Sequence, residues 1–286
     1  MGSFTYTLSQ FTQFNRFTTE GLFDDNYVHS NKSAIDDFVD KRTELFKLIW
    51  PYRENIANLP GELTKMILLG CISAVESYIR KIIRSIIIVD HASKKCCEER
   101  TLKYGAVVAH KDKSMLPEAL FENISFTSGK HIKETISSFL NVKCDNNQNL
   151  SMVLMEYSSV CELRHCVVHR FGLLGSSNAI RLGLSEHVKY IEKPIQIDFD
   201  RLNGIVQICN NLVKAVNSHL FAEIIERTFV ERTESWSNYR KDKKTFKKYL
   251  DIFIDSTNPL DYRMVYNEFL NCMHSKHGAE YQKPLN

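Results

Sequence analysis

Apolar side chains recur every three or four positions along most of this chain, and the first clear run follows Ser33. Five of them fall at helical spacing before Pro51: Ile35, Phe38, Leu45, Phe46 and Ile49. This spacing predicts an amphipathic helix over residues 33–50. Pro51 ends it, because proline lacks the backbone N–H that the next turn needs.

The second run has apolar residues on most of its faces. It covers residues 62–91, after Pro60 and Gly61, and charged side chains interrupt it, Glu76 and Arg80 among them. A helix that is apolar nearly all round is a buried one. The pattern therefore predicts the central helix of a helical bundle.

Further helices are expected downstream. Helical spacing continues over residues 125–140, 150–171 and 199–229, and residues 235–286 predict two short helices on either side of Pro259. Between the longer helices, residues 179–198 cluster β-branched side chains and predict a small β-hairpin.

Together these elements predict a mainly α fold, a helical bundle of four to five core helices with a hairpin insertion. The expected organisation is an N-terminal arm (residues 1–30), a helical domain (31–234) and a basic C-terminal helical extension (235–286). With 286 residues, 43% of them hydrophobic, the chain is long enough to bury such a core.

Composition bears on where the protein is located and on which partners it has. The net charge is only +3, so any nucleic-acid-binding surface must be local. The eight cysteines lack the regular spacing of a disulfide framework, and the N-terminus lacks the features of a signal peptide. Every apolar run is far shorter than the roughly 20 residues of a membrane span. We therefore expect a cytoplasmic protein with reduced thiols and no membrane partner.

The helix at residues 150–171 carries the candidate chemistry. At about 100° per residue, its apolar side chains share one arc that is expected to face the core: Val153, Tyr157, Val160, Leu163, Val167 and Phe171. His165 and His169, one turn apart, are expected on a solvent-facing stripe with Ser158 and Glu162.

Arg164 lies near the apolar edge of this helix, about 140° around it from His169. A guanidinium in such a place is costly unless a carboxylate or a phosphate meets it. Glu76 is the candidate carboxylate, although an intrahelical pair between Glu76 and Arg80 fits the sequence equally well.

The run Arg164-His165-Cys166-Val167-Val168-His169 resembles the signature of the HEPN ribonuclease family, an arginine followed by a polar residue and, a few positions later, a histidine. The earlier helix with Glu76 resembles the acidic helix of that family. The resemblance covers residues 33–230. It implies a HEPN-like helical bundle.

The resemblance also implies a reaction. In this family the RNA 2′-hydroxyl attacks the adjacent phosphate without a metal ion or a cofactor, leaving a 2′,3′-cyclic phosphate and a 5′-hydroxyl. His169 would exchange protons, and Arg164 would stabilise the charge on the phosphorane. His165 would orient the phosphate or share the proton transfers. Glu76 would position Arg164.

Partners follow from the same resemblance. A twofold axis would bring the motif helices of a homodimer into one cleft, so that both protomers complete the site. HEPN enzymes serve as toxins and antiphage effectors. This implies an RNA substrate, such as tRNA or single-stranded loops, and an antitoxin or another defence-system partner.

The bare spacing of arginine and histidine is not unique in this chain. Arg84 with His91, and Arg181 with His187, satisfy it as well. Arg164 differs because a polar residue follows it and because its histidine is expected to face solvent on a capped helix.

A zinc site is an alternative for the stripe Cys161, His165 and His169. The first and last of these lie eight residues apart, which is about 12 Å along a straight helix. Because that is too far for three ligands of one ion, no metal site is expected.

Residues 239–249 form the most basic window of the chain. Its cations are Arg240, Lys241, Lys243, Lys244, Lys247 and Lys248, and aromatic residues lie among them. This composition can hold a phosphate backbone and stack bases, although it also fits a solvated helix face. The expected function is an endoribonuclease. The alternative is a catalytically silent module of the same fold that serves dimerisation or the binding of nucleotides or RNA.

Overall fold

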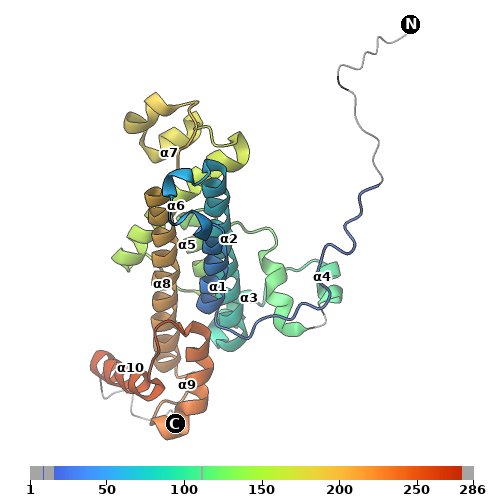
Figure 1. Ribbon diagram of the computed structural model, residues 1–286. Coiled ribbons are helices and arrows are strands. Elements are labelled where there is room, and N and C mark those ends of the chain that lie inside the picture. Colours follow the sequence, from blue (N-terminus) through green and yellow to red (C-terminus); the bar gives the residue numbers. More distant parts are fainter. Residues whose placement is uncertain (1–8, 10–15, 111, 279–286) are drawn as a thin grey trace. The chain divides into compact units, whose positions relative to one another are not determined.

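The computed structural model describes residues 9, 16–110 and 112–278 and divides the chain into two units, Met1–Asn31 and Lys32–Asn286. All α-helices among these residues belong to the second unit (Figure 1). They are α1 (Ala34–Lys47), α2 (Gly61–Val89), α3 (His91–Cys97), α4 (Tyr104–Ala109), α5 (Gly129–Leu140), α6 (Gln148–Arg170), α7 (Ser176–His187), α8 (Phe199–Val230), α9 (Tyr239–Phe253) and α10 (Tyr262–His277). Short 3₁₀ helices add η1 (Trp50–Tyr52), η2 (Ile56–Asn58), η3 (Lys113–Phe121) and η4 (Val188–Tyr190). The predicted mainly α class is confirmed.

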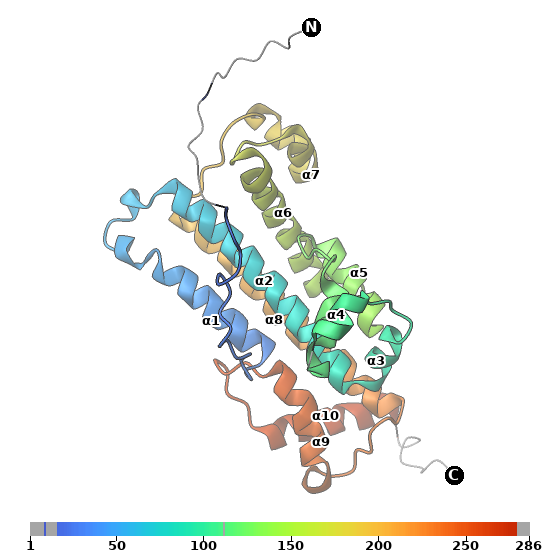
Figure 2. The same ribbon diagram turned by 90° about the vertical axis from the view of Figure 1, so that its right-hand side faces the viewer.

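Two long helices, α2 and α8, form the centre of the bundle. Figure 2 shows them side by side, with α1 on one side and α5 and α6 on the other. Apolar side chains line the inner face of α2 and have no exposed surface, among them Ile67, Leu68, Val75, Ile79 and Ile83. None of the helices in the described part of the chain is both long enough and apolar enough to cross a membrane.

Several helices begin at residues whose side chains cap them. Ser33, Ser128, Asn147 and Asp198 each accept a hydrogen bond from a backbone N–H in the first turn, of α1, α5, α6 and α8 respectively. Such a cap satisfies a donor that has no partner within the helix. The starts of the main bundle helices are therefore encoded locally.

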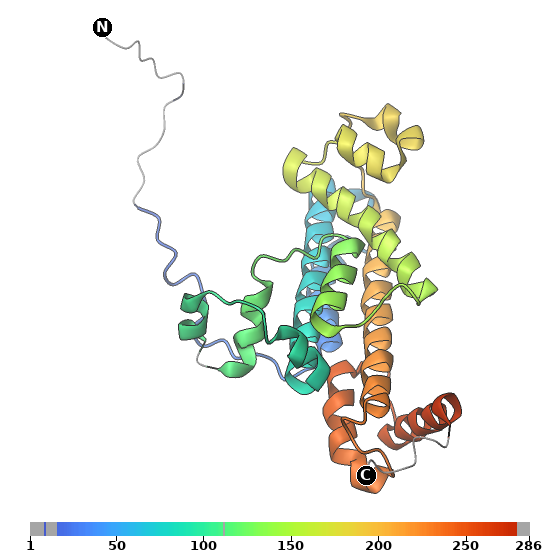
Figure 3. The same cartoon turned by 180° about the vertical axis from the view of Figure 1, so that it is seen from behind.

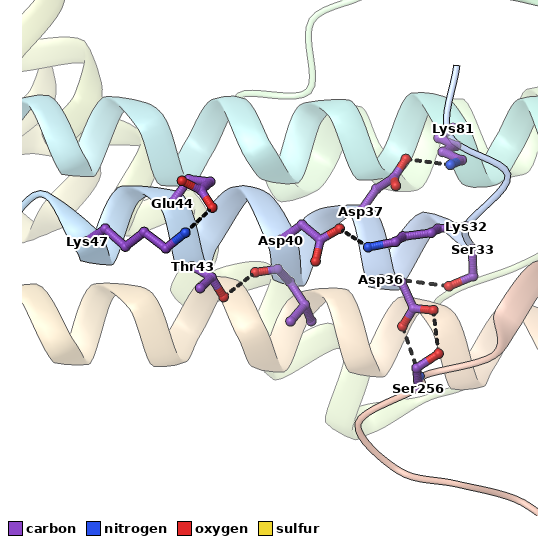
Figure 4. Close-up of polar contacts among 11 residues, drawn as sticks. Lys32, Ser33, Asp36, Asp37, Asp40, Thr43, Glu44, Lys47, Lys81 and Ser256 are labelled. Atoms are coloured by element: carbon purple, nitrogen blue, oxygen red, sulfur yellow. Dashed lines mark hydrogen bonds and ion pairs between the residues drawn. The ribbon is translucent and has the colours of Figure 1, made fainter. Parts of the chain in front are cut away.

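Polar contacts join α1 to its neighbours (Figure 4). Asp37 forms an ion pair with Lys81 on α2, and both side chains are mostly buried. The Asp36 carboxylate accepts hydrogen bonds from the backbone N–H and the hydroxyl of Ser256, at 2.9 and 2.7 Å. The start of α1 is thereby joined to the loop between α9 and α10.

The C-terminal helices share the core of the bundle. Phe246, Tyr249 and Leu250 on α9 are buried and pack with the core residues of the other helices. The Trp236 indole donates to the hydroxyl of Thr228 on α8 at 3.0 Å. The segment after α8 is thus held firmly against the end of that helix.

The predicted hairpin at residues 179–198 is not formed. Its first half lies in α7, and its second half pairs instead with the segment just after α6, through a bridge between Leu173 and Pro194. The prediction failed because a short cluster of apolar and β-branched residues does not distinguish a strand from a buried helix turn. Ala179 is fully buried within α7.

The two ends of the bundle carry different elements. The N-terminal end of α8 lies near the end of α6 and α7, whereas its C-terminal end lies near α9 and α10 (Figure 1, Figure 3). Near the start of α8, Arg201 lines the same hollow as Cys166 of α6. Near the end of α8, Thr228 contacts Trp236. At about 1.5 Å per residue, α8 rises about 40 Å from Arg201 to Thr228.

Candidate active site

The candidate residues lie where α6 emerges from the bundle. Leu154, Cys161 and Val168 are seven residues apart and lie along one side of the helix. Leu154 and Cys161 are each 4% exposed, but Val168 is 46% exposed. The cover that the bundle provides for α6 therefore ends within its last two turns.

Arg164 is half-buried in this region of α6. It makes no hydrogen bond or ion pair with any residue that the structure describes. Its positive charge acts on the Cys161 thiol one turn earlier and favours the thiolate there. A half-buried guanidinium without a carboxylate is unusual, because desolvation is not offset by a partner.

Glu76 does not pair with Arg164 or with Arg80. Its carboxylate accepts a hydrogen bond from the backbone N–H of Phe126 at 3.0 Å. Arg80 instead forms an ion pair with Glu118 at 3.3 Å and donates to the carbonyl of Ile124 at 3.1 Å. Glu76 therefore anchors the segment before α5, and neither of its two predicted ion pairs is present.

The charges of Glu76 and Arg164 both act on Cys161. The pKa of its thiol is raised to about 12, mainly by burial; the Glu76 carboxylate acts in the same direction, while Tyr157 and Arg164 act in the opposite one. A thiol with such a pKa stays protonated at neutral pH and is a poor nucleophile or metal ligand. Its role here is to fill the core.

His165 and His169 lie together on the exposed side of α6. Their ring centroids are 4.3 Å apart, with an angle of 47° between the ring planes. The pKa of His165 is lowered from its ordinary value, first by partial burial and then by the charge of His169. A lowered pKa leaves His165 neutral at pH 7, ready to accept a proton.

The other two members of the predicted polar stripe have structural partners. The Ser158 hydroxyl accepts a hydrogen bond from the Gly129 N–H at 2.9 Å, at the start of α5. Glu162 accepts a hydrogen bond from Asn178 at 2.8 Å and pairs with Arg181 at 3.2 Å, both on α7. The stripe is thus divided, and only the two histidines face solvent.

The arginines of the two competing motifs are engaged elsewhere. Arg84 forms an ion pair with Glu118 at 2.8 Å, and Arg181 forms the pair with Glu162. The Nδ1 atom of His187 lies 2.8 Å from the carbonyl oxygen of Gly183. Among the three candidate arginines, Arg164 alone has no acidic partner within the described residues.

Phe171 departs from the predicted core arc. The other five members of that arc are buried or half-buried, but Phe171 is 82% exposed, and its backbone is left-handed at φ 51°. That conformation costs about 1–2 kcal/mol for a residue with a Cβ. A helical wheel cannot show where the cover from neighbouring helices ends, so sequence reasoning missed both Val168 and Phe171 as surface residues of the site.

The zinc alternative is not supported by these positions. Cys161 is buried, whereas His165 and His169 are exposed. Within the described part of the chain, no group of three or more His, Cys, Asp or Glu side chains is arranged to hold a metal ion.

The six predicted RNA-binding cations lie at the other end of the bundle. All of them are exposed on α9: Arg240, Lys241, Lys243, Lys244, Lys247 and Lys248. The end of α6 and α9 are separated by most of the length of α8 (Figure 1). Within one chain, the basic helix and the motif therefore lie at opposite ends of α8.

Comparison with protein-family models, with curated proteins and with solved structures finds no match for this chain. The function must therefore be argued from the side chains of α6 and their surroundings.

Proposed function

We propose that this protein is a metal-independent endoribonuclease whose active site forms between the α6 helices of a homodimer. The observation that carries the proposal is Arg164, a half-buried guanidinium with no acidic partner among the described residues, next to two exposed histidines. A phosphate is the natural counter-ion for such a group, since guanidinium and phosphate match in charge and in hydrogen-bond geometry.

The reaction needs a base, an acid and charge stabilisation. One neutral imidazole accepts the proton of the RNA 2′-hydroxyl as the 2′-oxygen bonds to phosphorus. The bond to the 5′-oxygen breaks, and a protonated imidazole donates a proton to that leaving oxygen. The Arg164 guanidinium stabilises the charge on the phosphorane. The products are a 2′,3′-cyclic phosphate and a 5′-hydroxyl.

The residues divide between these roles. His165 suits the base, because its lowered pKa keeps it neutral at pH 7. His169 is the second proton carrier. Glu76 has a positioning role through the Phe126 backbone rather than through Arg164.

A second copy of the chain completes the site. Arg164 and His169 lie about 140° apart around α6, so one helix does not direct both at the same phosphate. The uncovered Val168 and Phe171 provide apolar surface beside them. Exposed apolar side chains flanked by polar groups are typical of protein interfaces.

The substrate and setting follow the HEPN resemblance. RNA is the substrate, such as tRNA or a single-stranded loop, and the α9 cations contact its phosphates. A role as a toxin or antiphage effector, with an antitoxin or defence-system partner in the cytoplasm, belongs to the same proposal.

The test is RNA cleavage by the purified full chain in the presence of EDTA. We expect cyclic-phosphate products from the wild type and a loss of at least a hundredfold in Arg164→Ala and His169→Ala, as for removal of a charge-stabilising group or a proton-transfer group. Arg53→Ala and His91→Ala are matched controls, because both residues are exposed and lie outside α6. Equal cleavage by all five proteins would refute the proposal.

The second candidate is a catalytically silent module that dimerises or binds nucleotides or RNA. The engagement of Glu76 with Phe126 favours it, because the acidic residue of the motif does not contact Arg164. An EDTA-treated wild type that binds RNA and leaves it intact under all conditions would select this candidate.

A further inference from the structure

A hollow of about 660 Å³ lies between α9 and α10. Its charged and amide-bearing walls come from Arg240 and Lys243 on α9 and from Arg263 and Asn267 on α10. Arg263 and Asn267 are four residues apart, so they lie one turn apart on the same side of α10. We call this hollow the α9–α10 groove.

The cations of the groove are not neutralised by any residue that the structure describes. Arg240, Lys243 and Arg263 are all exposed, and within the described residues none of their side chains forms an ion pair. The buried carboxylate of the neighbouring Asp242 is already engaged. It accepts hydrogen bonds from the backbone N–H groups of Ser237 and Asn238, at 2.6 and 2.9 Å, and from the hydroxyl of Tyr266.

The walls of the groove are held in place by packing. Tyr266 is buried, its hydroxyl is fixed by Asp242, and its ring packs against Phe246 with centroids 5.1 Å apart. Tyr239 packs against Tyr266 at 5.4 Å and lines the groove. Three positive charges thus lie along a hollow whose aromatic wall is fixed by packing, which reduces the ordering that binding requires of that wall.

We propose that the α9–α10 groove is a binding site for the backbone phosphates of single-stranded RNA. The choice of RNA rests on the proposed function. Three cations on two helices, Arg240, Lys243 and Arg263, have no acidic partner among the described residues. The groove also has an aromatic wall on which a base can stack. Lys244, Lys247 and Lys248 extend the positive surface along α9.

This site is distinct from the candidate active site. It lies at the far end of α8 from the motif, and α8 rises about 40 Å between Arg201 and Thr228. Binding in the groove therefore does not require Arg164 or His169, and loss of the groove does not remove the catalytic groups. The two sites can be tested independently.

The experiment measures binding of the full chain to a fluorescent 20-nucleotide RNA whose 2′-hydroxyls are methylated, so that it cannot be cleaved by 2′-attack. The test variant combines Arg240→Gln, Lys243→Gln and Arg263→Gln. The control variant combines Lys94→Gln, Lys103→Gln and Lys130→Gln, which removes the same charge from exposed positions on other elements. Circular dichroism checks that both variants are folded.

We expect the groove variant to bind at least tenfold more weakly and the control to stay within threefold of the wild type. Each lost phosphate contact removes about 0.7 from the slope of log affinity against log salt for single strands, so three contacts lower the slope by about 2. His91→Ala, at an exposed position outside both sites, should bind like the wild type. A wild type that binds through the groove but leaves cleavable RNA intact would support this proposal and refute the nuclease proposal, so the two can fail separately.

Three outcomes would overturn the proposal. The groove variant could bind within threefold of the wild type, or the control could weaken binding to the same extent. Poly-glutamate of matched charge could displace the RNA as effectively as unlabelled RNA does, which would assign the groove to an acidic protein partner.

Discussion

The Glu76 carboxylate accepts a hydrogen bond from the backbone N–H of Phe126 at 3.0 Å, and so joins α2 to the segment that precedes α5. The hydroxyl of Tyr157 donates a hydrogen bond to the carbonyl oxygen of Phe126 at 3.2 Å. Phe126 itself is fully buried. Glu76 is therefore a structural residue of the bundle, next to the helix that carries the candidate chemistry.

We predict that Glu76→Ala lowers the free energy of unfolding by about 1–3 kcal/mol, because it leaves the Phe126 N–H without its partner. Glu76→Gln keeps an oxygen acceptor and should lose less. Urea unfolding of the two variants measures the difference. If both variants keep wild-type stability but lose RNA cleavage equally, Glu76 acts in the chemistry instead.

A buried ion pair joins three parts of the bundle. Arg227 on α8 pairs with Asp90, which follows α2, and donates to the carbonyl of Leu140 at 2.6 Å, at the end of α5. The Arg227 side chain is 11% exposed and that of Asp90 is 4% exposed. Removing one partner of such a pair leaves the other charge buried and alone.

We therefore predict that Asp90→Ala destabilises the fold by about 3–5 kcal/mol. Asp40→Ala provides the matched control, because Asp40 pairs with Lys32 at 2.6 Å on the surface, where both side chains are more than half exposed. Exposed pairs contribute little, so this variant should unfold close to the wild type. Similar denaturation midpoints for both variants would contradict the prediction.

The helices could be predicted from the sequence because the signals that define them are local. Ser33, Ser128 and Asp198 cap helices whose apolar residues recur every three or four positions. In the structure, α1, α5 and α8 begin directly after these three residues. The hairpin prediction failed because a short apolar run carries a weaker local signal than a long capped helix. Residues 179–184 form part of α7, and contacts of Asn178 and Arg181 with Glu162 join α7 to α6.

The candidate site could be predicted only in part. The exposure of His165 and His169 follows from their place on the helical wheel of α6. The partner of Glu76 is a backbone N–H about 50 residues away in the chain, and no side-chain pattern identifies such a donor. The exposure of Val168 and Phe171 depends on where neighbouring helices end, which is a property of the tertiary structure.

Cysteine reactivity should separate buried from exposed thiols. Burial raises the pKa of Cys71 and of Cys144 to about 11 and that of Cys161 to about 12. A raised pKa means a smaller thiolate fraction at every pH below it, so at pH 8 these thiols are almost wholly protonated and unreactive. Cys272 is exposed.

We predict that iodoacetamide at pH 8 modifies Cys272 first and leaves Cys71, Cys144 and Cys161 intact, as measured by peptide mass spectrometry. In concentrated urea all four should react. Modification of Cys161 in the native protein as fast as Cys272 would mean that α6 leaves the bundle readily.

The pH dependence of cleavage should follow His165. Because burial and the charge of His169 lower its pKa below the ordinary value of 6.5, His165 stays neutral as the pH falls to that value and below. Activity that needs a neutral base is then lost only as the pH falls through this lowered pKa. The acidic limb of the rate profile should therefore lie below pH 6.5.

A second measurement tests the cause of this shift without using activity. We predict that the pKa of His165 observed by NMR rises toward 6.5 in His169→Ala, because one positive neighbour is removed, and is unchanged in His91→Ala. Since burial is the larger cause, the rise should be incomplete. Titration of His165 above 6.5 in the wild type would contradict the assignment of the base.

The homodimer makes the most demanding prediction, because the composite site depends on it. Val168 and Phe171 are 46% and 82% exposed near the candidate residues. A glutamate at either position would place a charge inside the proposed interface, where it would be desolvated without a partner. We predict that Phe171→Glu converts the protein to a monomer in sedimentation and abolishes RNA cleavage.

Met155→Glu is the matched control for this experiment. Met155 is also on α6 and is 63% exposed, but it lies two to four turns from the motif. The Met155→Glu variant should remain dimeric and active. Loss of function in Phe171→Glu could then not be assigned merely to an added charge in this region of the chain. A wild-type protein that is monomeric at micromolar concentration and still cleaves RNA would refute the composite active site, because Arg164 and His169 would then have to act from one helix.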